Sequence, residues 1–260
     1  MHFRRIAIWL ALFSLPLAAK TWSRTFAVHG QPALHVSTDN AAITVQAWSR
    51  AEVQVQVVSR AWGSSSDQFN AEASQSGNLI SVLVRTPHHF FSFGGESIHI
   101  TVETPSPARL ALHSSNGAIH VMDVAGELEL STSNGSIHAR HAGGEVRATS
   151  SNGSVHLDGR IQTLLARTSN GSIHIVAQPG SSVSSRWTLT SGNGSIHLQL
   201  PSDLSAQVEA HTGLGSIHCG LPLHGSQAVG HIGRHELHGT LNRGGPVIAL
   251  RSGNGSISIN

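Results

Sequence analysis

The chain has 260 residues, 12% charged residues and a formal net charge of +2, and its length allows one large core or two small ones. Lys20 is the only lysine, which argues against nucleic-acid binding, because such a function requires a dense basic patch. Cys219 is the single cysteine, so no internal disulfide can stabilise the fold. Histidine is unusually frequent, with 19 residues.

Residues 1–19 have the pattern of a secretory signal peptide. Arg4 and Arg5 provide the positive start, Ile6 to Leu17 the apolar stretch, and Ala18-Ala19 a small-residue cleavage site. The apolar stretch is shorter than the roughly 20 residues of a membrane-spanning helix. No later segment is apolar enough to cross a membrane. We therefore expect an exported protein, located in the periplasm, at the cell surface or outside the cell, with no transmembrane segment after signal removal.

Residues 20–33 are predicted to be a linker, and residues 34–105 a β-rich N-terminal region. Polar and apolar residues alternate there, as in β-strands. The strands expected from this alternation are Glu52 to Arg60, Leu79 to Arg85 and Ser97 to Thr104. The spacing of Leu34, Val36, Asn40, Ile43 and Val45 matches that of a unit that recurs later, so this region contains one divergent copy. Pro105 and Pro107 separate it from the main array.

Residues 106–260 contain an internal repeat centred on Asn-Gly. Four copies stand 18 residues apart, at Asn116, Asn134, Asn152 and Asn170. Looser copies follow at Asn193-Gly194, Leu214-Gly215 and Asn254-Gly255. A fixed short period indicates one small structural unit that stacks on itself.

Four positions of the repeat are apolar in almost every copy, and they lie six and four residues before the central Asn and three and five after it. Side chains alternate between the faces of a strand, so these positions point the same way and should form the core. They are Leu110, Leu128, Val146, Leu164, Trp187, Val208 and Ile248; Leu112, Leu130, Ala148, Ala166, Leu189, Ala210 and Leu250; Ile119, Ile137, Val155, Ile173, Ile196, Ile217 and Ile257; and Val121, Ala139, Leu157, Ile175, Leu198, Cys219 and Ile259. Cys219 is accordingly interpreted as a small buried apolar residue.

Two all-β folds fit this unit. Asn-Gly is a strong signal for a two-residue hairpin, so a string of antiparallel hairpins is possible. The alternative is a short β-solenoid, in which each 18-residue unit forms one coil of two strands and two turns. The near-identity of successive copies favours the solenoid, because coils stacked in register place identical side chains over one another. An Asn ladder is then expected at the turns.

The repeat resembles that of the bacterial putative adhesin family. The resemblance is carried by the stretch from Leu110 to Ile119, by the recurrent Thr-Ser-Asn-Gly-Ser-Ile units and by the closing stretch from His238 to Gly245 with the strand residues after it, and it extends from about Leu34 to Asn260. Members of this family are exported β-solenoid domains related to the head domains of auto-transporter adhesins. The resemblance implies adhesion, but it supplies no site residues.

One polar column could carry chemistry. A histidine follows the repeat centre by four residues in six copies and alternates with the core isoleucines, so it points outward: His120, His138, His156, His174, His197 and His218. In a solenoid these imidazoles would form a ladder at the strand spacing of about 4.8 Å. Neutral imidazole is a good ligand for Zn²⁺, Cu²⁺ or Ni²⁺. Stacked imidazoles should also have depressed and spread pKa values.

The leading hypothesis is a non-enzymatic surface interaction module whose partner is a glycan or a protein. Divalent-metal binding by the histidine ladder is the alternative. A third possibility, a carbohydrate-active enzyme, lacks the paired carboxylates that sugar hydrolysis uses. The recurrent Ser-Ile-His has no recurrent acid to complete a catalytic triad. The ends of an open solenoid can pair edge to edge, which would give a homo-oligomer.

Overall fold

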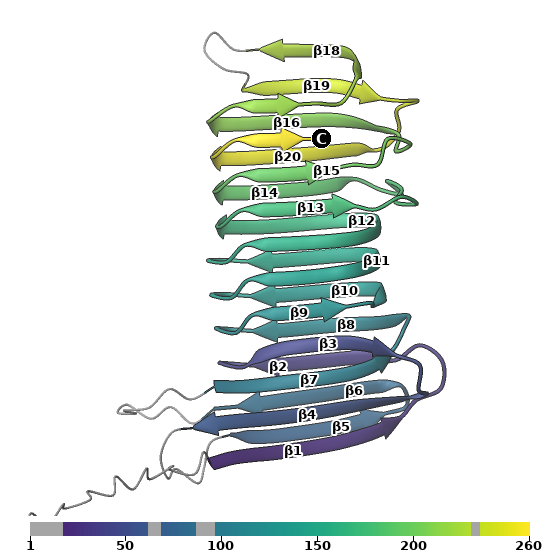
Figure 1. Ribbon diagram of the computed structural model, residues 1–260, viewed down its shortest axis with the longest axis vertical. Helices are drawn as coiled ribbons and strands as arrows, with labels where there is room; N and C mark the ends of the chain where they lie inside the picture. The colour runs from purple at the N-terminus through teal and green to yellow at the C-terminus, as the bar shows by residue number, and fades with distance from the viewer. Residues whose placement is uncertain (1–17, 62–68, 87–96, 230–234) are drawn as a thin grey trace, which may run out of the picture.

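A computed structural model of the chain describes residues 18–61, 69–86, 97–229 and 235–260. These residues form 21 β-strands in one continuous sheet that is wound into an elongated rod (Figure 1). In these ranges no helix is long and apolar enough to span a membrane. The predicted signal peptide, apart from Ala18 and Ala19, lies outside the described residues.

Each coil of the rod consists of two strands joined at the Asn-Gly corner. The strands that precede the corner form one side of the rod, here called face 1, and those that follow it form face 2. Face 1 of the repeat array contains β8 (Ala108–Ser114), β10 (Ala125–Thr132), β14 (Trp187–Asn193), β16 (Ala206–Leu214), β20 (Val247–Asn254) and the second halves of β11 (Ile137–Ser150) and β12 (Val155–Asn170). Face 2 contains the first halves of β11 and β12 with β9 (Ile119–Met122), β13 (Ile173–Ala177), β15 (Ile196–Gln199), β17 (Ile217–Cys219) and β21 (Ile257–Ile259).

Parallel pairing between equivalent strands confirms the solenoid and shows that the hairpin alternative is wrong. On face 1, Leu128 of β10 pairs with Leu110 of β8 on one side and with Val146 of β11 on the other. On face 2, Ile137 pairs with both Ile119 and Val155. Residues 18 apart therefore lie directly over one another, as the period of the repeat predicts.

The four predicted apolar columns form the core. All of their members are buried except Cys219, which is half-buried. Trp187 is fully buried, and its indole Nε1 donates a hydrogen bond to the carbonyl of Gln162. Cys219 is less buried than predicted because β17 pairs only with β21 and is the last strand of face 2.

The order of the coils departs from the order of the sequence at the C-terminal end. The last coil, β20 and β21, lies between the coil of β14 and β15 and the coil of β16 and β17, and it pairs in parallel with both. Beyond β16 the chain adds β18 (Leu223–Val229) and β19 (Glu236–Leu241), which pair antiparallel to each other, while β19 pairs antiparallel to β16. The C-terminus is therefore inside the stack, near the upper end in Figure 1.

The N-terminal end has the same kind of insertion. The divergent copy forms the coil of β2 (Ala33–Thr38) and β3 (Ala42–Trp48). This coil lies between β8 and β9 on one side and β6 (Leu79–Arg85) and β7 (Ser97–Pro105) on the other. The divergent copy is thus separated from the array in sequence but stacks directly on it.

The prediction of a linker over residues 20–33 is wrong, because β1 (Ala18–Ala27) occupies most of it. β1 pairs antiparallel with β4 (Glu52–Ala61), β4 with β7, and β5 (Asn70–Ser76) with β6. Phe26 and Val28 are buried in the core, and their burial holds this segment against the rod. From β1, Arg24 donates to the carbonyl of Ala73 on β5 at 2.7 Å.

The Asn-Gly corner is shaped by stacking and not by a hairpin turn. None of the repeat asparagines has a positive φ. A Cβ at Gly153 would lie 1.9 Å from the carbonyl oxygen of Gly135 in the coil below, so only glycine fits at this spacing. In the array of residues 106–260, the residue two before each central Asn is a buried Ser or Thr that bonds to the neighbouring coil. Thr132 Oγ1, for example, donates to the carbonyl of Gly117 and accepts from the amide of Gly135.

Candidate functional site

The histidine column lies on the outer surface of face 2. Its rings stack along the rod because each histidine pairs in register with the next. The ring centroids of His120 and His138 are 5.1 Å apart, and those of His138 and His156 are 4.8 Å apart, with interplanar angles of 9° and 3°. His174 and His197 continue the column with centroid separations of 5.9 Å and tilted rings.

His218 is not part of this continuous row. The inserted coil places Ser258 between His197 and His218, and Ser258 pairs with both. The prediction of six consecutive imidazoles is therefore wrong at its C-terminal end. The reason is the insertion of the last coil, which the order of the sequence does not reveal.

Three members of the column have a lowered pKa. Burial is the main cause at His120, His138 and His156. Positive neighbours lower the pKa further: Arg140 and His99 at His120, and His156, His120 and Arg140 at His138. His174 adds to the effect at His156. At these three residues the direction of the shift agrees with the expectation for stacked imidazoles.

The stacked rings are not arranged as a closed metal site. A tetrahedral Zn²⁺ with ligand distances of about 2.0–2.1 Å requires its nitrogen ligands to converge on one point. Parallel rings 4.8 Å apart direct their nitrogens side by side, so ligation would require the rings to rotate. In the described part of the chain, no three His, Cys, Asp or Glu side chains form a group that could hold a metal ion.

The asparagines form a continuous amide ladder along the corner. In each step, Nδ2 of one Asn donates to Oδ1 of the Asn in the neighbouring coil, at 2.5–2.9 Å, in the order Asn254, Asn193, Asn170, Asn152, Asn134, Asn116, Asn40. Asn40 in turn donates to Thr86 Oγ1. The predicted Asn ladder is therefore confirmed, and its role is structural.

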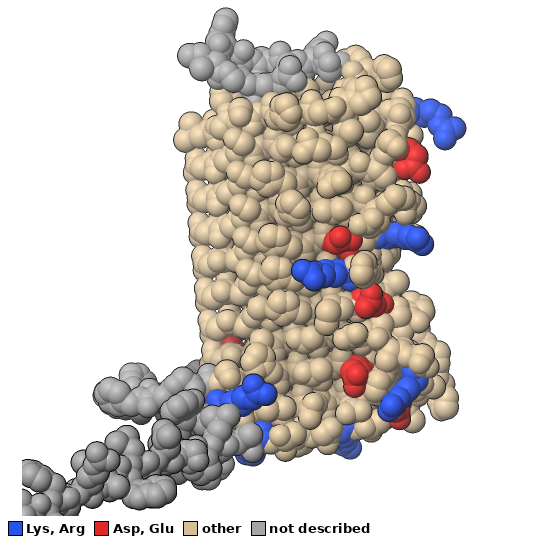
Figure 2. Space-filling view, viewed as in Figure 1, with Lys and Arg blue, Asp and Glu red and all other residues tan. Residues whose placement is uncertain are grey.

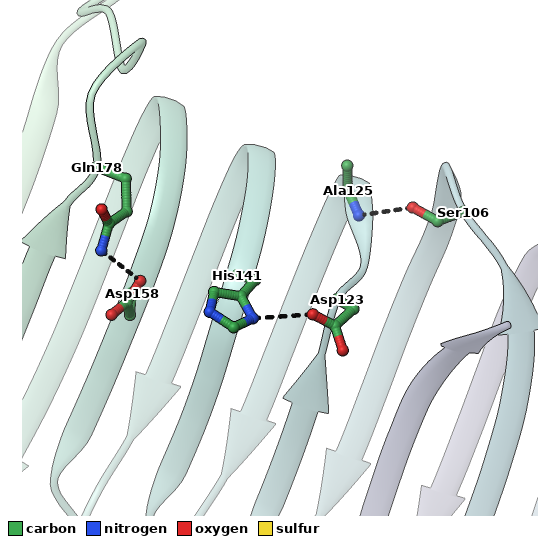
Figure 3. Close-up of polar contacts among 6 residues, drawn as sticks. All are labelled: Ser106, Asp123, Ala125, His141, Asp158 and Gln178. Atoms are coloured by element: carbon green, nitrogen blue, oxygen red, sulfur yellow. Dashed lines mark hydrogen bonds and ion pairs between the residues drawn. The ribbon is translucent and has the colours of Figure 1, made fainter.

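The opposite corner carries a polar row that the sequence reasoning missed (Figure 3). Asp123 and His141, one coil apart, have left-handed φ values of 61° and 50° and face each other, with 2.8 Å between Oδ1 and Nδ1. In the neighbouring coils, Gln178 Nε2 donates to Asp158 Oδ1 at 3.0 Å. Non-glycine residues with such φ values are uncommon and often have a functional role.

A shallow cleft of about 550 Å³ adjoins this row. Small residues of neighbouring coils line it together with the side chains of His141, Arg160 and Gln178. The signal that could have revealed this corner is a deviation from the repeat, since Asp123, His141 and Asp158 do not recur with the period. Predictions drawn from recurrent positions therefore do not identify this corner.

Formal charge is sparse on one broad side of the rod, where most of the visible surface carries no Lys, Arg, Asp or Glu side chain (Figure 2). On the outer surface of face 2, serines such as Ser136 and Ser154 flank the histidine column on the corner side. On the other side lies a column that includes Met122, Arg140 and Asp158. The histidines are thus the main titratable groups of this surface.

No family model and no curated protein matches the chain. Among solved structures, a putative adhesin from Bacteroides fragilis matches with a TM-score of 0.53 and 14% identity, covering 93% of this chain and 97% of that one. A putative cell adhesion protein from Clostridium sporogenes matches with a TM-score of 0.42 and 9% identity, covering 93% and 99%. The Bacteroides structure supports the fold.

Proposed function

We propose that the chain is an exported, non-enzymatic, adhesin-like module that binds a surface ligand, a glycan or a protein, through the outer columns of its solenoid. The observation that carries the proposal is the register of the coils. Pairing of His138 with both His120 and His156 turns one side chain per repeat into a row. A row of equivalent groups can make many weak contacts with a repetitive ligand, and such contacts add through effective concentration.

The solved Bacteroides fragilis structure with a similar fold supports this proposal, since that protein is described as a putative adhesin. Export would bring the module to the periplasm, the cell surface or the outside of the cell. Cell fractionation of the native producer tests this part: the mature chain should be recovered outside the cytoplasm, with its N-terminus near Lys20.

A glycan array and binding to intact cells test the ligand-binding part. The purified chain should retain a defined subset of glycans or a proteinaceous surface component, and a chain shortened by one repeat should bind the same ligand more weakly. Absence of retention by any surface or glycan would overturn the proposal. Hydrolysis of a retained polymer, lost when one acidic residue is replaced, would show that the module is an enzyme.

Metal binding by the histidine column remains a second candidate, because the separation of neighbouring rings would allow a bridging ion after ring rotation. Calorimetric titration with Zn²⁺, Cu²⁺ and Ni²⁺ tests it. Stoichiometric micromolar binding that is abolished by His156→Ala would support this function. Weak binding that is unchanged by the substitution would exclude a specific site in the column.

A further inference from the structure

The histidine column combines three features that the adhesin proposal does not by itself explain. It is regular, with ring centroids 4.8–5.9 Å apart from His120 to His197. It is accessible, since His156, His174 and His197 are exposed and His120 and His138 are half-buried. It consists of imidazoles, the side chains whose ordinary pKa lies nearest to neutral pH.

Protonation would convert this neutral row into a line of positive charges. The charged and titratable groups around it are few. Arg140 and Asp158 lie beside it on β11 and β12, and His99 and Glu103 lie on β7 beyond its N-terminal end. Asp158 accepts a hydrogen bond from Gln178 (Figure 3). Neither carboxylate recurs along the row, so the described part of the chain offers no matching line of counter-charges.

We propose that the histidine column binds a linear acidic polysaccharide with one carboxylate on each sugar, and that binding is coupled to protonation of the imidazoles. This inference rests on the proposed adhesin function and specifies its ligand class. A linear polymer with a carboxylate on each sugar can lie along this regular row and bring several of its carboxylates within reach of imidazoles from different coils. The adjacent serine hydroxyls and the column itself supply hydrogen-bond donors for carboxylate and hydroxyl oxygens.

The direction of the coupling follows from the electrostatics. In the absence of ligand, burial and like-charged neighbours lower the pKa of His120, His138 and His156, so these rings are neutral at pH 7.5. A carboxylate opposite each ring would raise its pKa, and binding would take up protons. By linkage, the affinity must then rise as the pH falls, by about tenfold per pH unit for each net proton taken up.

A nucleic acid is a less suitable polyanion for this surface. The chain has one lysine, and the column contains no Phe, Tyr or Trp on which bases could stack. The phosphate backbone of a nucleic acid is usually bound by clustered Lys and Arg, which the described part of this surface lacks. A carboxylate polymer requires only a row of single positive charges. A single-stranded DNA oligomer is therefore the appropriate competing probe.

The test is calorimetric titration of the purified chain with polygalacturonate at pH 5.0, 6.0 and 7.5. We expect affinity to rise at least tenfold from pH 7.5 to pH 5.0 and to fall with added salt. Fully methyl-esterified polymer, galacturonic acid monomer and the DNA oligomer should bind at least tenfold more weakly at pH 5.0. Equal or tighter binding of any of these would overturn the inference.

Two sets of variants locate the site. Replacement of His120, His138 and His156 by Gln should remove most of the pH-dependent gain, while replacement of the exposed His29, His35 and His113 by Gln removes as many imidazoles elsewhere and should leave it intact. The single variant His138→Gln should reduce the gain at least threefold if the triple variant does not fold. Equal effects of both triple variants, or no effect of His138→Gln, would contradict the inference. Glycan or cell binding that persists without pH dependence would refute the polyuronate ligand and leave the adhesin function in place.

Discussion

The middle of the rod and its two ends are built by different rules. From β8 to β15 the coils stack in the order of the sequence, and each coil contacts copies of itself on both sides. At both ends a coil is inserted out of sequence order, and antiparallel strands cover the end of the stack. At the C-terminal end β19 covers β16, and at the N-terminal end β5 covers β6 and β4 covers β7. The middle is therefore modular, whereas each end depends on contacts between segments far apart in the sequence.

The N-terminal end also differs from the middle in how its buried polar groups are satisfied. In the middle, each buried hydroxyl bridges two coils, as Ser150 does between the carbonyl of Gly135 and the amide of Gly153. At the N-terminal end the equivalent Thr38 Oγ1 is buried and has no hydrogen-bond partner among the described residues. The regular stack thus pairs each buried hydroxyl with the corner of a neighbouring coil, whereas the coil of β2 and β3 leaves the hydroxyl of Thr38 unpaired within the described ranges.

The largest expected effect comes from removing an inserted coil. Deletion of residues 246–260 removes Ile248, Leu250, Ile257 and Ile259, which are fully buried, and each such loss is worth about 2–5 kcal/mol. We therefore expect the truncated chain to lose its cooperative unfolding transition in urea. Circular dichroism during a urea titration measures this loss.

Excision of one middle unit, Asn134–Ser151, is the matched control. It joins Ser133 to Asn152 and keeps the register of the repeat, so the shortened chain should still unfold cooperatively. If the truncation is tolerated and the excision is not, the distinction between modular middle and dependent ends is wrong.

The next effect compares one hydroxyl at two positions. Thr132→Val leaves the carbonyl of Gly117 and the amide of Gly135 without their side-chain partner and should lower the free energy of unfolding by about 1–3 kcal/mol. Thr38→Val removes a buried hydroxyl that has no such partner, so no hydrogen bond is lost and the free energy of unfolding should stay the same or rise, by up to about 1–3 kcal/mol. Urea denaturation of both variants measures the difference, and equal losses would show that the bridging bonds contribute nothing.

A smaller effect should appear as a pH dependence of stability. The folded-state pKa of His120, His138 and His156 lies below the ordinary value of 6.5, so the unfolded chain binds protons more readily. The free energy of unfolding should therefore decrease as the pH falls through 6.5 toward the lower folded-state values and should be fully restored above that range. Thermal melts from pH 5 to 8 measure it, and the variant with Gln at all three positions should show a weaker decrease. A decrease of the same size in that variant would assign it to other groups.

The smallest effect concerns the end of the Asn ladder. The outermost coil has Leu214 where the others have Asn, and this leucine is 69% exposed beside Asn254. Leu214→Asn can extend the ladder by one bond and should stabilise the fold by about 0.5–1 kcal/mol. Leu214→Ala is the control for loss of the exposed leucine, and a gain of the same size in both variants would exclude the added amide bond as its cause.

The sequence predicts the middle well and the ends poorly, for a physical reason. Near-identical units have one favourable arrangement, in which Leu110 lies beside Leu128 and Ile119 beside Ile137, so period and alternation suffice. The insertion of Ser258 between His197 and His218 depends on which unlike coils fit together, and no local pattern encodes it. The left-handed Asp123 and His141 were missed for a related reason, since they differ from the repeat.

The amide ladder gives the rod an electrical direction. Every Nδ2 from Asn254 to Asn116 donates toward the N-terminal end, so the side-chain dipoles add head to tail, as peptide dipoles do in an α-helix. Polarisation along such a chain strengthens each bond, and reversing one amide would break the bonds on both sides of it. The corner therefore acts as a side-chain macrodipole, with its negative pole at the carbonyl of Asn254 and its positive pole at Asn40.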